Sequence, residues 1–481
     1  MNTSSPRPHL SATGLAVLLT GQLLPIIDFS IVNVALASIS QTLKVTQTWL
    51  GMVVAVYGVA FAVCLAMAGR LGDNFGRRRL FGIGVAVFAV ASLLCGLATS
   101  IWVLLAARAL QGAGAALVVP QTLATIHVCL HGREHSRALG IYGSISGISF
   151  VVGQVLGGLL VTANWGGAGW RAVFLINLPI CAGVLLLMWR TIPETRVEKA
   201  ISVDVSGTVI LALLTLCLLI PLALGPTMHW PIQLDMLLAC VVPLMWLLRR
   251  VEINQERRGV SPLLPPALAR LPSTRFGALI AAIMFSSWSG FMFASALTLQ
   301  TGAGLSPAKA GNSYVSLGIA FFAGSLLTPR LVARLGNVPT LLSGCAVQML
   351  GLVTLMATLD YVWPHPGLVN LIPATALIGF GQALIVSCFY RIGLSDVPAS
   401  QAGAGSAMLA TVQQVSFGLG PAVFGGIFSY ILRETSGSYL HAMHAALLTE
   451  LALMSLLCVR GILYHRWQQT LKCAPYNAAQ Q

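Results

Sequence analysis

The chain has 481 residues, of which 57% are hydrophobic and 8% carry a charged side chain, and its formal net charge is +14. An average soluble domain has about 25% charged residues, so the charges here are too few to cover a water-facing surface. Apolar runs of about 20 residues recur along the chain, and each is long enough to cross a hydrocarbon layer of roughly 30 Å as a helix. Composition therefore excludes a soluble globular protein and predicts an all-α polytopic membrane protein.

Fourteen runs are predicted to span the membrane, at residues 14–38, 49–69, 80–99, 101–127, 138–162, 171–190, 205–225, 233–249, 276–300, 312–333, 339–361, 367–391, 403–431 and 441–463. The first run has no small-residue cleavage site ahead of a soluble domain, so we interpret it as a retained span and not a signal peptide. Nine of the ten cysteines lie within or beside these runs and none forms a CxxC pair, so no disulfide framework, metal site or cofactor is expected.

The basic residues predict the orientation, because Lys and Arg are retained on the cytoplasmic side of short loops. If both termini are cytoplasmic, all but five of the 27 Lys and Arg residues fall in cytoplasmic segments. Lys44, Arg171, Lys309 and Arg433 fall outside, and Arg108 falls within a span. The net charge thus reflects orientation and contact with an anionic lipid leaflet. No nucleic-acid partner is expected, since the chain has no soluble basic domain.

Two loops in equivalent positions share a pattern. GRLGDNFGRRRL at 69–80 follows the second span and PRLVARLGN at 329–337 follows the tenth, and they match at Arg70 with Arg330, Leu71 with Leu331 and Gly76 with Gly336. Because internal duplication is common in transporters, we interpret the chain as two six-span halves around an extra central pair. The predicted divisions are a cytoplasmic tail at 1–13, a six-helix half at 14–190, linkers at 191–275 with the extra pair at 205–225 and 233–249, a six-helix half at 276–463, and a cytoplasmic tail at 464–481.

GRLGDNFGRRRL resembles the loop motif of the major facilitator superfamily, and the extra pair resembles its fourteen-span drug:proton antiporter branch. DFSIVNVAL, LLAARALQGAGAALVVP and WRAVFLINLPI agree with this resemblance. The resemblance implies the major facilitator fold, with 14 transmembrane helices and both termini cytoplasmic, in a bacterial inner membrane. It also implies export of hydrophobic, cationic drugs or toxic compounds in exchange for protons by alternating access.

The loop motif contains Gly69, Gly72 and Gly76, which permit a tight turn and close helix approach. Asp73 can accept hydrogen bonds from a helix N-terminus, and Arg77 holds the loop on the cytoplasmic face. The resemblance implies that these residues form a latch between the halves, made in one access state and broken in the other. The alternative for the arginines of this loop is that they only fix topology.

Arg108 is predicted to lie within the fourth span, where an Arg costs at least roughly 2.5 to 3.5 kcal/mol. Gln111 lies one turn further on, and small residues follow it. The resemblance implies a part for Arg108 in proton relay. The alternative is a structural Arg that is tied to backbone carbonyls or to a neighbouring carboxylate.

Asp28 stands alone within the apolar run LLPIIDFSIVNVAL. An acid inside the membrane marks a transport pathway by default, so we predict that Asp28 binds a proton in one state and a cationic substrate in another. The alternatives are a fixed ion pair with Arg108 and an acid at the membrane interface. Glu450 is the other deep acid, but the last helix of a half usually lies outside the cavity in this family, and its role stays open.

The fifth span resembles the family's antiporter motif in four glycines, Gly140, Gly153, Gly157 and Gly158. It departs at Ser149 and Gln154, where a small residue and then a Pro are usual, and this departure removes a predicted helix bend and puts antiport in question. Gly420 and Pro421 in the thirteenth span can supply a bend in the other half.

Polar and aromatic residues in the spans are candidate contacts for flat amphiphilic cations, by stacking and hydrogen bonding. With Asp28 and Gln111, the candidates are Trp49, Tyr57, Trp288, Gln382, Gln413 and Gln414. The alternative for aromatics near span ends is an anchor at the membrane interface.

Two rival functions keep the same fold: export of one endogenous metabolite, and facilitated transport without proton coupling. An enzyme is not expected, because the chain contains no HExxH, GxSxG or GxxxxGK[ST] motif, and the last absence also disfavours ATP-driven transport. The expected partners are a small-molecule substrate, protons and the lipid bilayer. A monomer is expected, and a periplasmic adaptor protein stays open as a partner.

Overall fold

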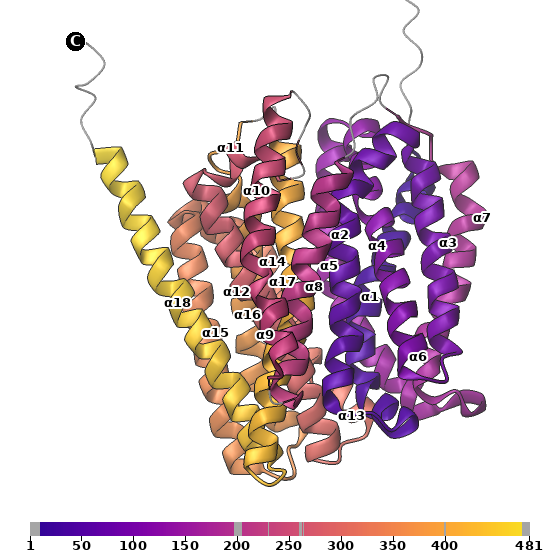
Figure 1. Ribbon diagram of the computed structural model, residues 1–481, viewed down its shortest axis with the longest axis vertical. Helices are drawn as coiled ribbons and strands as arrows, with labels where there is room; N and C mark the ends of the chain where they lie inside the picture. Colours follow the sequence, from indigo (N-terminus) through magenta and orange to yellow (C-terminus); the bar gives the residue numbers. More distant parts are fainter. Residues whose placement is uncertain are drawn as a thin grey trace, which may run out of the picture.

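The computed structural model describes residues 10–196, 204–228, 230–258, 262, 264–398 and 401–473, and every regular element in them is a helix. Figure 1 shows long helices running side by side, with the first part of the chain in indigo to violet and the last part in orange to yellow. In that view helix α8 lies near the boundary between these two groups, and α9 and α10 overlap the C-terminal group. The all-helical prediction is confirmed.

The N-terminal helices are α1 (Ala12–Leu43), α2 (Gln47–Phe75), α3 (Arg77–Gly96), α4 (Ile101–Cys129), α5 (Gly132–Ala163), the short 3-10 turns η1 (Trp165–Gly167) and η2 (Gly169–Arg171), α6 (Ala172–Leu175) and α7 (Asn177–Thr191). The central helices are α8 (Val205–Met228), α9 (Ile232–Ala239), α10 (Val241–Arg257) and α11 (Pro266–Ala269).

The C-terminal helices are α12 (Pro272–Leu297), the π-helical turn η3 (Thr298–Gly302), α13 (Pro307–Asn312), α14 (Val315–Leu335), α15 (Asn337–Val362), α16 (Leu368–Gly393), α17 (Ala402–Glu434) and α18 (Tyr439–Cys473). Thirteen helices among the described residues are long and apolar enough to cross a membrane. Helix α5 adds the shorter apolar segment Val152–Ala163. Each predicted run thus coincides largely with one helix or, at 171–190 and 233–249, with consecutive helices. The count of fourteen crossings stays a prediction.

Small residues set how closely the helices approach, as expected where apolar lipid provides no hydrophobic drive between them. Helix α4 packs on α2 and α3. A Cβ at Gly112 would collide with the Tyr57 carbonyl oxygen, and a Cβ at Gly114 would lie 2.7 Å from the Phe88 nitrogen. Glycine therefore fixes the place of α4, the helix that carries Arg108.

The boundary between the two groups of helices also uses small residues. Helix α2 packs on α17, where a Cβ at Gly58 would lie 2.8 Å from the Gly418 Cα. Helix α5 packs on α13 and α14, where a Cβ at Gly158 would lie 2.7 Å from the Pro307 carbonyl oxygen. Gly58 and Gly158 thus mark two places where the N-terminal and C-terminal groups come into backbone contact.

Helix α8 packs on both α2 and α17, and α10 packs on α8. Asp204 begins α8 by accepting hydrogen bonds from the Gly207 nitrogen at 2.7 Å and from Gln255 Nε2 of α10 at 2.6 Å. Arg70 Nη2 of α2 donates to the Pro262 carbonyl oxygen at 2.6 Å. The central helices are therefore fastened to one another and to the end of α2.

Candidate functional site

Asp28 lies at the centre of a group of polar side chains from four helices. We call Asp28 of α1, Ser92 of α3, Arg108 and Gln111 of α4 and Asn177 of α7 the Asp28 cluster. All five side chains are buried, and those of Asp28 and Arg108 are fully enclosed. The prediction placed Asp28 and Arg108 in spans, and the structure brings them into contact.

The Asp28 carboxylate accepts hydrogen bonds from three side chains. Arg108 Nη1 donates to Oδ2 in a close ion pair. Gln111 Nε2 donates to Oδ1 at 2.7 Å, and Asn177 Nδ2 donates to the same oxygen at 3.1 Å. Charge-assisted hydrogen bonds of this kind are the strong ones, so an ionised Asp28 is well compensated here.

Arg108 is held by both kinds of partner that the sequence left open, a carboxylate and a backbone carbonyl. Besides Asp28, its Nε donates to the Val53 carbonyl oxygen at 3.1 Å and its Nη1 donates to Gln111 Oε1 at 2.6 Å. The guanidinium carbon also lies 4.2 Å from the centre of the Tyr57 ring, a cation–π contact. These contacts offset the cost of burying the cation.

Ser92 and Asn177 complete the cluster, and the sequence interpretation missed both. The Ser92 hydroxyl oxygen accepts from Gln111 Nε2 at 2.9 Å and from Asn177 Nδ2 at 3.3 Å. Both amides are thereby oriented with their NH2 groups towards the Asp28 carboxylate. Asn177 is the polar residue within WRAVFLINLPI, a signal that was visible in the sequence.

A second group of side chains joins the two groups of helices. We call Phe29 of α1, Phe285 and Trp288 of α12, Phe321 of α14, Phe389 of α16 and Phe417 of α17 the aromatic cluster. Ring centres of Phe29 and Phe417 lie 4.8 Å apart, and Phe417 lies 5.0 Å from Phe285 and 5.9 Å from Trp288. Phe321 lies 5.6 Å from Trp288, and Phe389 lies 5.5 Å from Phe285.

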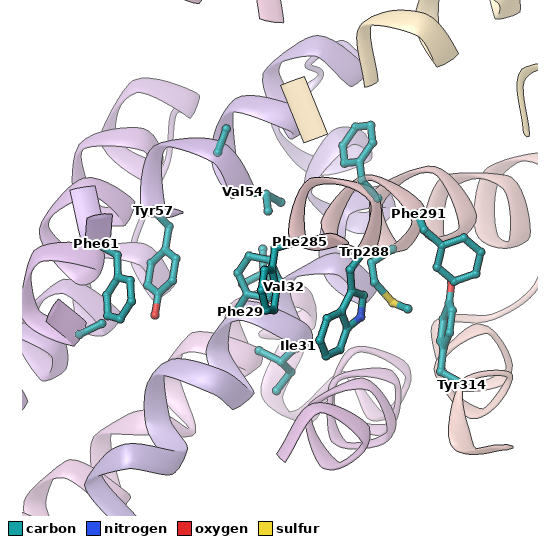
Figure 2. Close-up of a cluster of buried hydrophobic side chains, with 14 of the residues drawn as sticks. Phe29, Ile31, Val32, Val54, Tyr57, Phe61, Phe285, Trp288, Phe291 and Tyr314 are labelled. Atoms are coloured by element: carbon teal, nitrogen blue, oxygen red, sulfur yellow. The ribbon is translucent and has the colours of Figure 1, made fainter. Parts of the chain in front are cut away.

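Figure 2 shows Phe29 of α1 together with Phe285 and Trp288 of α12. Of these three residues, only Trp288 was a candidate from the sequence. Aromatic rings at such distances offer faces and edges to one another and to a flat ligand. The aromatic cluster therefore packs ring against ring where the two groups of helices meet.

The remaining predicted contacts are dispersed. Gln382 of α16 is fully buried, and neither its Oε1 nor its Nε2 has a hydrogen-bond partner among the described residues. Gln413 Oε1 accepts from the Tyr390 hydroxyl at 3.0 Å, and Gln414 is half-buried on the same helix. Trp49 packs edge-on against the Trp102 ring at 4.8 Å, outside both clusters.

The glycine-rich motif is mostly helical, so the predicted loop at 69–80 is reduced to a turn at Gly76. Helix α2 continues to Phe75, so Gly69, Gly72 and Asp73 are helical and only Gly76 turns the chain, with φ of +105°. Gly72 lies at a close approach of α2 to α4, because a Cβ there would collide with the Gln121 side chain of α4.

Asp73 and Arg77 form an ion pair across this turn, with Arg77 Nη2 donating to Asp73 Oδ1 at 2.6 Å. The N-terminus of α3 is met by Glu194, which accepts from the Arg78 nitrogen at 3.0 Å and from the Arg79 nitrogen at 3.3 Å. Asp73 thus binds Arg77, and its predicted hydrogen bond to a helix N-terminus stays a prediction. The latch between the halves stays a prediction.

The glycines of the fifth span hold α5 against α1. A Cβ at Gly153 would lie 2.8 Å from the Ile27 carbonyl oxygen, and one at Gly157 would lie 3.0 Å from that of Ile31. Gln154, where a Pro is usual, donates from Nε2 to the Ser30 carbonyl oxygen at 3.1 Å.

Ser149 is buried as well, and α5 is one uninterrupted helix. In α17, a Cβ at Gly420 would lie 2.9 Å from the Gly290 nitrogen, and Pro421 follows inside the same helix. The environment of Gly140 lies outside the part of the structure that is described.

Two solved structures resemble this arrangement of helices. A POT family transporter in complex with 5-aminolevulinic acid matches with a TM-score of 0.67 over 95% of this chain and 99% of that one, at 11% identity. A bacterial homolog to the human lysosomal transporter Spinster, in an inward-facing and unoccupied conformation, matches with a TM-score of 0.66 over 95% and 97%, at 17% identity. At these identities the likeness shows the fold alone.

Curated relatives cover most of the chain at higher identity. A Streptomyces coelicolor protein described as "Probable actinorhodin transporter" is 32% identical over 450 residues, 93% of this chain and 78% of that one. Multidrug resistance protein Stp of Mycobacterium tuberculosis is 33% identical over 435 residues, 89% and 76% of the two chains. The tetracenomycin C resistance and export protein of Streptomyces glaucescens is 31% identical over 426 residues, 87% and 75%.

The family model described as Major Facilitator Superfamily matches residues 18–421, which include the Asp28 cluster and most of the aromatic cluster's helices. A match over this length, together with relatives that are named transporters, shows that the chain is a transporter and not an enzyme. The chain belongs to the major facilitator superfamily and is a multi-pass membrane transporter.

Proposed function

We propose that this transporter exports hydrophobic aromatic compounds from a bacterial cell in exchange for protons, and that Asp28 and Arg108 couple the two fluxes. The observation that carries the proposal is the fully buried ion pair of these two residues, set in a hydrogen-bonded cluster within the family's first and fourth spans. A buried charge pair of this kind is expensive to build and marks a functional site inside a membrane.

Protonation of Asp28 would give the Asp28 cluster a second arrangement of hydrogen bonds. A proton on Asp28 removes the negative charge that holds Arg108, while Gln111 and the Val53 carbonyl remain within hydrogen-bond distance of the guanidinium. Arg108 then needs another acceptor, because an uncompensated cation is costly inside the membrane. Helices α1 and α4, which carry the two partners, would change their packing as the proton arrives and leaves.

Substrate recognition is proposed for the aromatic cluster, which lies at the boundary that alternating access must open and close. The relatives' names refer to actinorhodin and tetracenomycin C, and stacking between rings suits flat compounds. A cationic substrate would have to compete with Arg108 for the Asp28 carboxylate, so we propose stacking as the main source of affinity. Gln382, whose buried amide has no partner among the described residues, is proposed as a polar contact.

The predicted topology is part of the proposal. We propose fourteen crossings, both termini in the cytoplasm, and two moving halves at residues 14–190 and 276–463. The relatives' organisms are bacteria, which supports a cytoplasmic membrane. A monomer is proposed, and an adaptor protein in the periplasm stays a prediction without further support.

The test is ethidium transport into everted membrane vesicles under an imposed pH gradient. The native chain should accumulate dye only with the gradient, and Asp28→Asn should abolish that accumulation. Glu450→Gln is the matched control, because it makes the same acid-to-amide change at another deep acid. Equal transport by Asp28→Asn and the native chain would refute the coupling role, and gradient-independent transport by the native chain would favour an uncoupled facilitator.

A further inference from the structure

Glu450 lies deep in the membrane-spanning part of α18, far from the Asp28 cluster in the fold. It belongs to a stripe of buried side chains that recur every three or four residues, at Met443, Leu447, Glu450, Met454 and Leu457. Gln348 lies in the buried stripe of α15 that faces it, and both side chains are fully buried. Each residue is about eleven positions from the start of its helix, roughly 16 Å, which places the pair near the middle of the hydrocarbon layer.

The hydrogen bonds of this pair are incomplete if Glu450 is ionised. Gln348 Nε2 donates to Glu450 Oε1 at 2.8 Å. Glu450 Oε2 and Gln348 Oε1 are both buried, and neither has a partner among the described residues. With an ionised carboxylate, both atoms are acceptors only and both remain unsatisfied, which is rare for buried polar groups.

A proton on Glu450 gives both of these atoms a hydrogen-bond partner. A protonated carboxyl group is a donor through its O–H, and the Gln348 amide presents an acceptor beside the N–H that already binds Glu450. Acid and amide side chains can then exchange one hydrogen bond in each direction. The same proton removes a net charge from an apolar interior, where an unpaired ion is expensive.

The helices around the pair supply no cation for a carboxylate in the described part of the chain. Helix α18 packs on α12, α15, α17 and η3. The titratable or charged side chains on these elements include the thiols of Cys345 and Cys458, the His444 imidazole paired with Asp360 at 3.4 Å, and, at helix ends, Arg275, Arg433 and Glu434. On α18 the exposed side chains of His441 and Arg460 lie nine residues before and ten residues after Glu450. His444 stands six residues from Glu450, about 9 Å along the helix, and is engaged by another acid.

We propose that Glu450 binds a proton in the folded protein and donates it in a hydrogen bond to Gln348 Oε1, so that a neutral acid and an amide fasten α18 to α15. This proton site is separate from the Asp28 cluster and does not depend on the proposed transport cycle. Loss of the proton in alkaline solution leaves a bare charge between the two helices. Docking of α18 is therefore sensitive to pH.

Infrared spectroscopy of the purified full chain tests the protonation directly. The native protein at neutral pH should show the C=O stretching band of a protonated carboxylic acid, and Glu450→Gln should remove it. Asp28→Asn, the matched control at the other deep acid, should leave that band in place. Spectra of the native chain and Glu450→Gln that agree in this region at neutral pH would overturn the proposal.

Stability as a function of pH gives a second readout. Because the folded chain holds a proton that the unfolded chain releases, the native protein should lose stability as pH rises, by up to about tenfold in the unfolding equilibrium constant per pH unit. Glu450→Gln keeps an amide donor and should lack this component. An equally steep pH dependence in Glu450→Gln would overturn the proposal.

A pair of substitutions covers the case in which Glu450→Gln does not fold. Gln348→Leu alone leaves the acid without its partner and should destabilise the chain, whereas Gln348→Leu combined with Glu450→Leu removes both polar groups and should recover stability. A double variant no more stable than Gln348→Leu would count against a mutual pair.

Discussion

Replacing Asp28 by Asn should destabilise the protein by about 3–5 kcal/mol, the cost of leaving a buried ion without its partner. Arg108 would keep only the Val53 carbonyl oxygen and Gln111 Oε1 as acceptors. The new amide also brings an NH2 group to a place where Arg108, Gln111 and Asn177 all point donors, so at least one donor meets another donor. At about 1.4 kcal/mol for each factor of ten, the folded-to-unfolded ratio should fall roughly 10²- to 10⁴-fold.

The assay is reversible denaturation of the purified variants in detergent micelles, followed by circular dichroism. Glu450→Gln is the control and should change the free energy of unfolding by less than about 1 kcal/mol, since its amide can replace a neutral acid. Asp28→Asn combined with Arg108→Gln should regain much of the loss, because no charge remains uncompensated. If Asp28→Asn is as stable as the native chain, or if the double variant is less stable than the single one, the ion pair does not govern this site.

Three further substitutions probe the other features. Gly158→Leu should abolish transport without unfolding the chain, because its Cβ would lie 2.7 Å from the Pro307 carbonyl oxygen and α5 could not approach α13 in this state; native dye uptake by vesicles would contradict this. Glu194→Gln should lower the free energy of unfolding by about 1 kcal/mol through a weaker cap on α3 at Arg78, and an unchanged thermal midpoint would argue against that role. Phe417→Ala should weaken dye binding by about 0.5–1.5 kcal/mol per lost ring contact, measured by fluorescence titration, whereas equal affinity would remove the aromatic cluster from substrate recognition.

The ion pair of Asp28 and Arg108 was within reach of the sequence, because a charge inside an apolar run must be compensated and few opposite charges are available. The sequence left that pairing as an alternative, since the register between α1 and α4 is set by packing and not by local pattern. Ser92 and Asn177 were harder to recognise, because neutral polar residues are frequent in membrane helices and cost little when they bond locally.

The glycine-rich motif shows how tertiary contacts override local propensity. The sequence interpretation took residues 69–80 as the loop between two spans, with glycines that permit a tight turn and close helix approach, and glycine is a poor helix former. In the structure Gly72 lies against Gln121 and Asp73 binds Arg77, one helical turn on, and these contacts favour a helix through the motif. Gly76, whose positive φ suits a residue without a Cβ, makes the turn.

The position of helix α8 affects the route by which a lipid-soluble compound can enter the transporter laterally from the bilayer. The two bundles meet along two seams, one where α2 touches α17 and one where α5 touches α13 and α14. Helix α8 lies along the first seam and contacts both of its walls, and α10 packs on α8. A lipid-dissolved molecule arriving on that side meets two further layers of helix, so we expect lateral traffic to use the opposite flank, and the protein to have one sealed side and one side that membrane-borne cargo can approach.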